Sequence, residues 1–322
     1  MKRFLTMIVA VCAIFAASAQ HPMVTLSHNG ELSFFTDITA LNSAVEKAIT
    51  GDIIYLSDGV FLLQGNKLTI PRDKRISIVG NGYKSYIMGT VLVIRDINTP
   101  DSDVPLFDGV RMDLLKFDDD DNLLHYEGSS AIQRCWIADV KLGYLAGKNI
   151  TYDKCYIENY ENGISGLDPS YTVFKNSKVK PSSDTYRFTA INCNVYNVYE
   201  YPSKLISCIV TASPSGGYAA NSPKIINSVL DRTITDDRAT LYNCYTFECN
   251  DTSLLLDENM DCPLNLEELG YLGQDGTVVG IYGGEYPFSE NPSLPSVDTA
   301  NSSVEYDAEN NKLKVNITVK AD

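Results

Sequence analysis

The chain has 322 residues, 44% of them hydrophobic, and a formal net charge of −15 at neutral pH. This length and apolar content suffice for a sizeable core, whereas the negative charge disfavours nucleic acid and anionic membranes as partners, because both attract lysine and arginine. The charge also disfavours a polyanionic substrate unless a local basic patch or a bound cation reverses the field.

Residues 1–19 have the pattern of a secretory signal peptide. Lys2 and Arg3 give a positive start, an apolar run extends from Leu5 to Phe15, and Ala17-Ser18-Ala19 is a small-residue cleavage site. The run is too short to span a bilayer. We therefore expect cleavage after Ala19, no membrane insertion, and a mature chain that is secreted, periplasmic or attached to the cell surface.

A short amphipathic helix is predicted near residues 37–49. Its apolar residues recur at helical spacing from Ala40 to Ala48, Thr36 or Asp37 is a candidate N-cap, and Gly51 follows the segment. The next segments, from Asp52 onward, alternate in the manner of strands separated by turns such as Gly80-Asn81-Gly82.

From residue 131 to residue 249 one short phrase recurs: apolar, any, polar, Cys or Ser, any, aliphatic. The Cys or Ser positions are 135, 155, 177, 193, 208, 228 and 244, separated by 20, 22, 16, 15, 20 and 16 residues. Apolar residues three before and two after this position fit no helical face, but they fit two short strands joined by a bend. A recurrence of this length with variable insertions predicts a coil of parallel β-structure, with the preceding helix as a lid over its first turn.

Asparagine is frequent at the position before the Cys or Ser. It occurs as Asn176, Asn192, Asn227 and Asn243. Asparagine tolerates left-handed backbone angles and therefore suits a tight corner. Stacked corners would place these amides above one another, so that each donates to the next. The sequence thus predicts a structural asparagine ladder.

The cysteines of the phrase predict packing rather than disulfides. Ser177 and Ser228 replace cysteine at the same inward position, and a site that accepts either residue requires a small side chain. No metal site is expected, because Cys-x-x-Cys pairs are absent and the histidines are scattered. The acidic run from Asp118 to Asp121 is interpreted as a solvated loop, and Ca²⁺ is considered only for a lyase, without a supporting motif.

The repeated Asn-Cys/Ser phrase, its spacing and the asparagine ladder resemble the right-handed parallel β-helix proteins of the pectate-lyase-like superfamily. The segment Gly51–Gly82 resembles their opening coils, and "DGTVVGIYGGEYPF" is similar to the end of secreted β-helix proteins of Gram-negative gut bacteria. The resemblance implies an all-β fold: a right-handed parallel β-helix (solenoid) over residues 20–290, with an N-terminal capping helix and a C-terminal β-strand tail at 291–322. The tail alternates from Leu313 to Val319, and either covers the last coil or leads to a partner.

In this superfamily substrates lie in a groove along the first strand of each coil, which the resemblance places between the phrases. The candidate glycan-groove residues there are Arg187, Tyr199, Glu200, Tyr201, Asp236, Asp237 and Arg238. Adjacent carboxylates on a strand point to opposite faces, so Asp236 and Asp237 alone do not form a hydrolase pair. Lys178 and Lys180 are expected on an exposed outer face together with Trp136, Tyr156 and Tyr245, serving solubility.

No catalytic residue can be assigned from the sequence. Tyrosine-rich outer faces suit stacking on sugar rings, so the first hypothesis is an exported protein that binds an extracellular polysaccharide or glycan along an outer face. Two alternatives stay open: a polysaccharide lyase or glycoside hydrolase acting on such a glycan, and a structural or adhesive surface protein.

Overall fold

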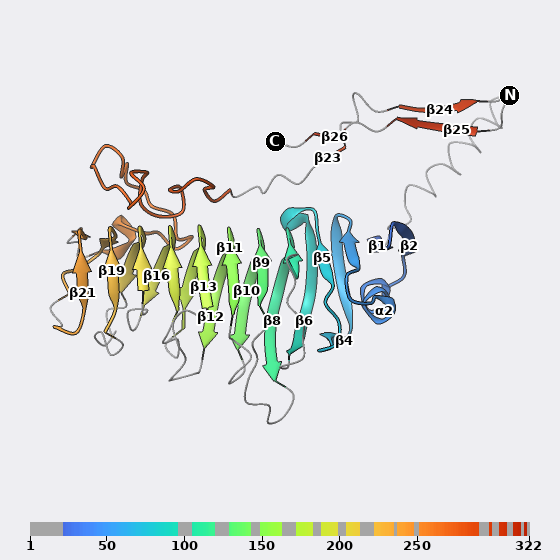
Figure 1. Ribbon diagram of the computed structural model, residues 1–322, viewed down its shortest axis with the longest axis horizontal. Coiled ribbons are helices and arrows are strands. Elements are labelled where there is room, and N and C mark those ends of the chain that lie inside the picture. The colour runs from blue at the N-terminus through green and yellow to red at the C-terminus, as the bar shows by residue number, and fades with distance from the viewer. Residues whose placement is uncertain are drawn as a thin grey trace, which may run out of the picture.

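The computed structural model describes residues 22–95, 105–119, 129–142, 149–162, 172–182, 188–198, 204–212, 222–234, 237–247 and 251–289, together with short backbone strands in the tail. The described chain is a parallel β-solenoid, in which strands of two sheets alternate along the sequence and stack along one axis (Figure 1). The predicted all-β parallel coil is thereby confirmed.

The first sheet has twelve strands in the order β2-β1-β3-β5-β7-β9-β11-β13-β15-β17-β19-β21. In chain order they are β1 Val24–His28, β2 Glu31–Phe35, β3 Ile53–Leu56, β5 Ser77–Val79, β7 Phe107–Asp108, β9 Ser130–Gln133, β11 Ile150–Asp153, β13 Thr172–Lys175, β15 Thr189–Ile191, β17 Lys204–Ile206, β19 Lys224–Ile226 and β21 Thr240–Tyr242. From β3 onward every pairing is parallel; β1 pairs antiparallel with both β2 and β3.

The second sheet has ten parallel strands in the order β22-β20-β18-β16-β14-β12-β10-β8-β6-β4. They are β4 Gly59–Ile70, β6 Ser85–Arg95, β8 Arg111–Asp119, β10 Trp136–Leu142, β12 Tyr156–Asn162, β14 Lys178–Pro181, β16 Asn194–Val198, β18 Ile209–Ala212, β20 Val229–Leu230 and β22 Tyr245–Thr246. The long strands β4 and β6 contain register shifts, and shorter strands follow toward the C-terminus.

The repeated phrase occupies the corner between the two sheets. Its three apolar or small positions point inward, as expected: Ile132, Cys135 and Ile137 are fully buried, and so are their counterparts in the following coils up to β20. The residue before each Cys or Ser turns the corner with a positive φ, which is 52° at Asn192 and 53° at Ser207. Left-handed backbone at this one position therefore redirects the chain from one sheet into the other.

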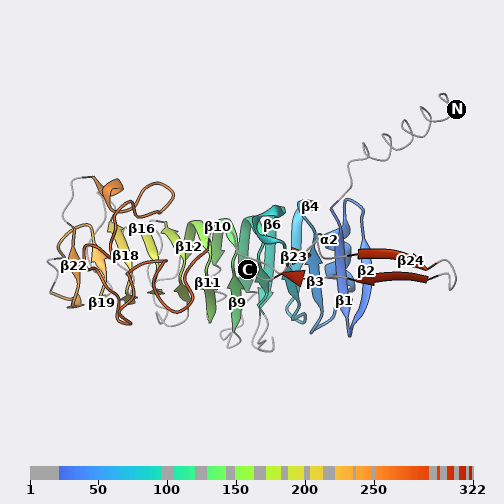
Figure 2. The ribbon, with the colours of Figure 1, turned by 90° about the horizontal axis from the view of Figure 1, so that it is seen from above.

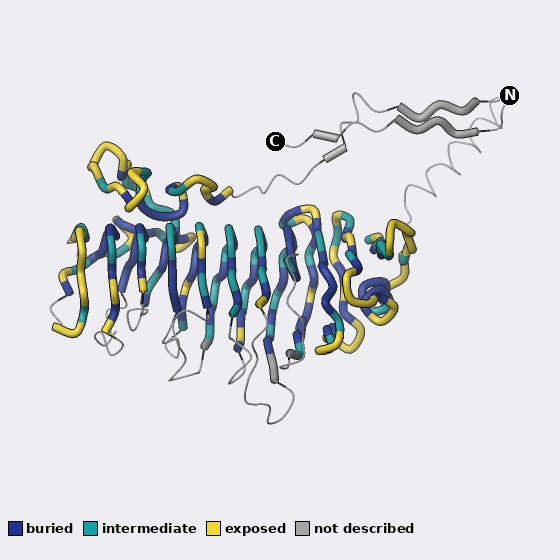
Figure 3. The backbone as a smooth tube through the Cα atoms, viewed as in Figure 1, coloured by how far each residue is buried: buried dark blue, intermediate teal, exposed yellow. Residues whose placement is uncertain are grey.

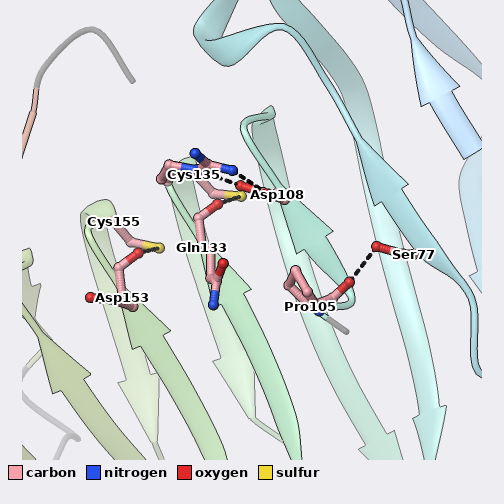
Figure 4. Close-up of polar contacts among 8 residues, drawn as sticks. Ser77, Pro105, Asp108, Gln133, Cys135, Asp153 and Cys155 are labelled. Carbon is pink, nitrogen blue, oxygen red and sulfur yellow. Dashed lines mark hydrogen bonds and ion pairs between the residues drawn. The ribbon is translucent and has the colours of Figure 1, made fainter. Parts of the chain in front are cut away.

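The phrase cysteines form a stack of free thiols inside the corner, as the sequence predicts. Cys135, Cys155, Cys193 and Cys208 are buried and unbridged, and Cys244 in the last coil is partly exposed. Each Sγ donates to the carbonyl oxygen two residues earlier, as Cys135 does to Gln133 at 3.0 Å (Figure 4). Burial, followed by the neighbouring thiol of Cys135, raises the pKa of Cys155 well above its ordinary value, so these groups pack as small neutral side chains.

The N-terminal end of the solenoid is closed by one helix and one hairpin. Helix α2, Ala40–Lys47, lies within the predicted range and buries its apolar stripe against the first coil. Asp37 accepts hydrogen bonds from the amide and hydroxyl of Thr39 just before the helix, and Lys74 donates to the carbonyls of Val45 and Glu46 at the helix end. The hairpin β1–β2 was not predicted; it extends the first sheet beyond β3.

Residues 251–289 fold back over the solenoid, and we call this segment the strap. It begins with a short 3-10 helix, η2 Thr252–Leu254, and has no other regular element. Figures 1 and 2 show it, in orange, crossing the coils that contain β16 and β18. Figure 3 shows its inner stretches buried and its outer stretches exposed. A second apolar cluster joins Leu255, Leu256 and Leu266 of the strap to Ile209 and Val229 of the second sheet.

The tail contributes two antiparallel strand pairs, β23 Ser296–Val297 with β26 Val319–Lys320, and β24 Ser303–Asp307 with β25 Lys312–Asn316. Leu313 and Val315 thus lie on a strand, as their alternation predicts. Within the described residues, no helix has the length and hydrophobicity needed to cross a membrane.

Candidate functional site

The described residues include only two of the seven predicted groove residues. Asp237 and Arg238 lie in an exposed turn before β21. The other five candidates, Arg187, Tyr199, Glu200, Tyr201 and Asp236, lie outside the described residues. The expectation of a groove at these positions therefore stays a prediction, and the described surface has to be searched for a site in its own right.

The corner asparagines follow one another at the expected place, but the strap supplies several of their partners. Asn243 Nδ2 donates to Asn227 Oδ1 at 3.2 Å, whereas Asn176 Nδ2 donates to the carbonyl of Gly283 in the strap at 2.9 Å. Ser207 interrupts the amide series, and its hydroxyl accepts from the amide of Gln274, also in the strap, at 2.9 Å. The corners thus form part of the strap's docking surface.

The outer face of the second sheet carries one continuous row of register partners. Side chains at the first outward position of successive strands lie side by side along the axis. From β6 to β14 these are Tyr86, Arg111, Trp136, Tyr156 and Lys178. The first four are half-buried, and with neighbouring strands about 4.8 Å apart they extend over roughly 15 Å. We call these four residues, together with the adjacent Tyr83, the ridge.

Contacts within the ridge are aromatic and cation–π. The indole ring of Trp136 lies edge-on to Tyr83 and to Tyr156, with centroids 5.4 and 5.3 Å apart. The guanidinium carbon of Arg111 lies 4.7 Å from the centroid of Tyr86 and 4.4 Å from that of Trp136. The arginine is therefore held between two rings from the coils on either side.

Two carboxylates orient the rings that flank Arg111. The hydroxyl of Tyr86 donates to Asp113 on the next coil, and the other oxygen of Asp113 accepts from the amide of Gly89 at 3.0 Å. Trp136 Nε1 donates to Glu158, again on the next coil, at 2.5 Å. The hydrogen bond to Asp113 is the main cause that raises the pKa of Tyr86, followed by burial, so the phenol stays a neutral donor at neutral pH.

The strap ends the ridge at Lys178. This residue is only 2% exposed, and its Nζ lies 2.7 Å from Asp261 Oδ1 in the strap and 5.4 Å from the ring centroid of Phe288. The expectation that Lys178 is a solubilising group on an exposed sheet is wrong, because the strap, which carries no periodic signal, covers this strand. Lys180 is exposed, as expected, with its Nζ 5.6 Å from the ring centroid of Tyr196.

Beyond Lys178 the same row is covered and changes in character. Its next members are Asn194, Ile209 and Val229, all buried. Asn194 Nδ2 donates to the carbonyl of Met260 at 2.8 Å, and its Oδ1 accepts from the amide of Ile281 at 3.3 Å. Gly280 has a φ of 87°, and a Cβ there would meet Asn194 Oδ1 at 2.6 Å, so the strap backbone approaches the sheet too closely for a side chain.

The best-formed hollows in the described part of the molecule are partly open and too small for a sizeable ligand. One, of about 80 Å³, lies between α2 and β4, lined by Ile38, Leu41 and Leu62; the other, of about 170 Å³, lies under the strap beside Asn194 and Leu264. Pockets for small organic ligands typically measure about 300–1,000 Å³. No group of three or more His, Cys, Asp or Glu side chains among the described residues could hold a metal ion. The open ridge is thus the strongest candidate site.

The fold and the ridge define the molecule as a parallel β-solenoid with an aromatic, arginine-containing outer face. Comparison with protein-family models, with curated proteins and with solved structures finds no match. Sequence analysis pointed to Trp136 and Tyr156 as outward-facing residues, but it missed Tyr86, Arg111 and their carboxylate anchors. Tyr86, Arg111 and Asp113 lie upstream of the recognisable phrase, so their register could not be inferred from it, and nothing in the phrase marks Glu158 as a partner of Trp136.

Proposed function

We propose that this protein binds a polysaccharide or glycan along the ridge on the outer face of the second sheet. The observation that carries the proposal is the row of half-buried rings and one guanidinium over four successive coils. Such a row offers apolar ring carbon, N–H donors and carboxylate acceptors in a line, which suits an extended chain of sugar rings. The signal peptide expected from the sequence supports a location outside the cytoplasm, and both this location and membership of the pectate-lyase-like β-helix proteins form part of the same proposal.

The test is a glycan-array screen of the mature protein, followed by affinity measurements on Trp136→Ala. This substitution removes the central ring, and loss of one stacked ring is worth about 1 kcal/mol or more, so we expect binding to weaken roughly tenfold. Trp136→Phe keeps a ring and should retain part of the affinity. Tyr242→Ala serves as a matched control, because Tyr242 is 69% exposed on the other sheet.

Urea unfolding of each variant must show an intact fold before the affinities are compared. The proposal fails if no glycan binds, or if a bound glycan ignores Trp136→Ala while Tyr242→Ala weakens it. Release of shortened sugar chains during the assay would instead favour the lyase or hydrolase alternative.

A further inference from the structure

Arg111 has no hydrogen bond or ion pair within the described part of the chain; its contacts are the two rings of Tyr86 and Trp136. A guanidinium carries five N–H donors in a rigid plane. Half-buried and unpaired, these donors are available to a ligand on the outer face of the sheet.

The position of the guanidinium is set before any ligand arrives. Tyr86 is tied by its hydroxyl to Asp113, and Trp136 is tied by its indole nitrogen to Glu158. The two rings sandwich the arginine with centroids 4.7 and 4.4 Å from its guanidinium carbon. A donor held in this way loses little conformational entropy on binding.

The charges around Arg111 favour an uncharged ligand. Asp113 and Glu158 each accept a hydrogen bond from one of the two rings that flank the guanidinium. Two carboxylates therefore lie close to the single arginine of the ridge. Lys178, the next cation in the row, is already paired with Asp261. An anionic sugar at Arg111 would approach both carboxylates, and the net charge of −15 adds repulsion at longer range.

Sugar hydroxyls satisfy this arrangement better than an anion does. A hydroxyl accepts from an N–H and donates to a carboxylate, whereas an ionised carboxyl or sulfate only accepts. Building on the glycan-binding function, we propose that Arg111 is the specificity-determining donor of a subsite for an uncharged, hydroxyl-rich sugar. Asp113 and Glu158 act there as positioning residues and as acceptors.

The experiment compares uncharged glycans with acidic counterparts of the same linkage. The probes are polygalacturonate with its carboxyl-reduced form, and a β-1,4-glucan oligosaccharide with its C6-oxidised form, together with the full array. The wild-type protein should bind the uncharged member of a pair at least tenfold more tightly. Its affinity for the uncharged glycan should change less than about twofold between 50 and 500 mM salt. An uncharged glycan carries no bound counterions that would be released when it binds.

The variants are Arg111→Lys, which keeps the charge but loses the planar fork, and Lys141→Gln as control. Lys141 is an exposed cation at the far end of β10, the strand that carries Trp136. We expect Arg111→Lys to weaken uncharged-glycan binding about tenfold, which corresponds to about 1.4 kcal/mol, and Lys141→Gln to leave it unchanged.

Tighter binding of the acidic member, or full affinity in Arg111→Lys, overturns this inference and leaves the glycan-binding function standing. Absence of binding to any glycan overturns the function itself. The Arg111→Glu variant gives a further test. It should bind uncharged glycans more weakly than the wild type does, and it should not bind acidic glycans.

Discussion

The second sheet has two halves that share one backbone repeat but differ in what covers them. Over β6 to β12 the first outward row is open and consists of Tyr86, Arg111, Trp136 and Tyr156. Over β14 to β20 the same row is Lys178, Asn194, Ile209 and Val229, all at most 2% exposed under the strap. Rings and a free cation mark the open half, whereas aliphatic side chains, one amide and one paired lysine mark the covered half.

This difference teaches that the strap, rather than the coil, determines the chemistry of each outer position. Side chains that point inward are alike in both halves, since the coil geometry requires small or apolar groups there. The character of the outward side chains depends on whether the strap covers them. Under the strap, Ile209 and Val229 form a second apolar cluster with strap residues. The open row keeps four large half-buried side chains without any cover from the strap, and these are the residues on which the proposed glycan binding depends.

The largest expected effect is a loss of folding stability when a buried leucine of the strap, but not an exposed one, is replaced by alanine. Leu256 is fully buried in the second apolar cluster, while Leu254, in η2, is 51% exposed. Leu256→Ala should lower the free energy of unfolding by about 2–5 kcal/mol, and Leu254→Ala should change it by less than about 0.5 kcal/mol. Urea unfolding measures both, and equal midpoints would show that the strap does not pack as part of the fold.

A medium effect is expected where the strap meets the corners. Asn192 and Asn243 have nearly equal positive φ values, 52° and 50°, but a Cβ on Gly284 of the strap would lie 2.4 Å from Asn192 Nδ2. Asn192→Lys should therefore cost about 1–3 kcal/mol through overpacking.

The matched control is Asn243→Lys at an exposed corner of the last coil. It loses a hydrogen bond to Asn227, which should cost at most about 1 kcal/mol. If thermal unfolding gave the same loss for both variants, the left-handed backbone alone would set the cost, and the contact with the strap would be irrelevant.

The smallest effect concerns the first sheet, outside both halves. Burial raises the pKa of Asp153, against the lowering influence of Lys154 and Lys175. A carboxyl with a raised folded-state pKa favours folding while protonated, and that contribution disappears as pH rises through the folded-state value. Asp153→Asn should therefore remove a small loss of stability that the wild type shows as the pH rises above about 4, the ordinary pKa of an aspartate.

Denaturant midpoints measured across this pH range, with Asp237→Asn as an exposed control, test the prediction. A wild-type protein whose midpoint rose more steeply with pH than that of Asp153→Asn would contradict it.

The architecture was predictable because the coil repeats its local chemistry. Cys135, Cys155 and Ser177 share one inward site, and the spacing between them indicates the stacking without knowledge of any contact. The capping helix was predictable for the same reason, since Leu41, Ala44 and Val45 lie on one helical face.

The candidate site was less predictable, because it depends on contacts between segments that share no pattern. The strap has almost no regular secondary structure, so nothing in residues 251–289 indicates that Asp261 reaches Lys178. Similarly, the register that aligns Arg111 with Trp136 follows from insertions between coils, and periodicity does not fix those lengths. The predicted groove stays untested, because five of its seven residues lie outside the described residues.

The strap also determines where the solenoid can accept an added or deleted coil. Each coil contacts mainly its two neighbours, so a whole coil is a natural unit of insertion. Under the strap, an extra turn would shift Asn194 away from Met260 and Ile281 and break the docking of the crossing segment. Between β6 and β10 no contact with the described strap fixes the length, whereas at the next coil the ring of Tyr286 in the strap already lies over Lys154. A duplicated coil there would lengthen the ridge by about 4.8 Å, so this half of the solenoid is where an engineer could extend the proposed binding row.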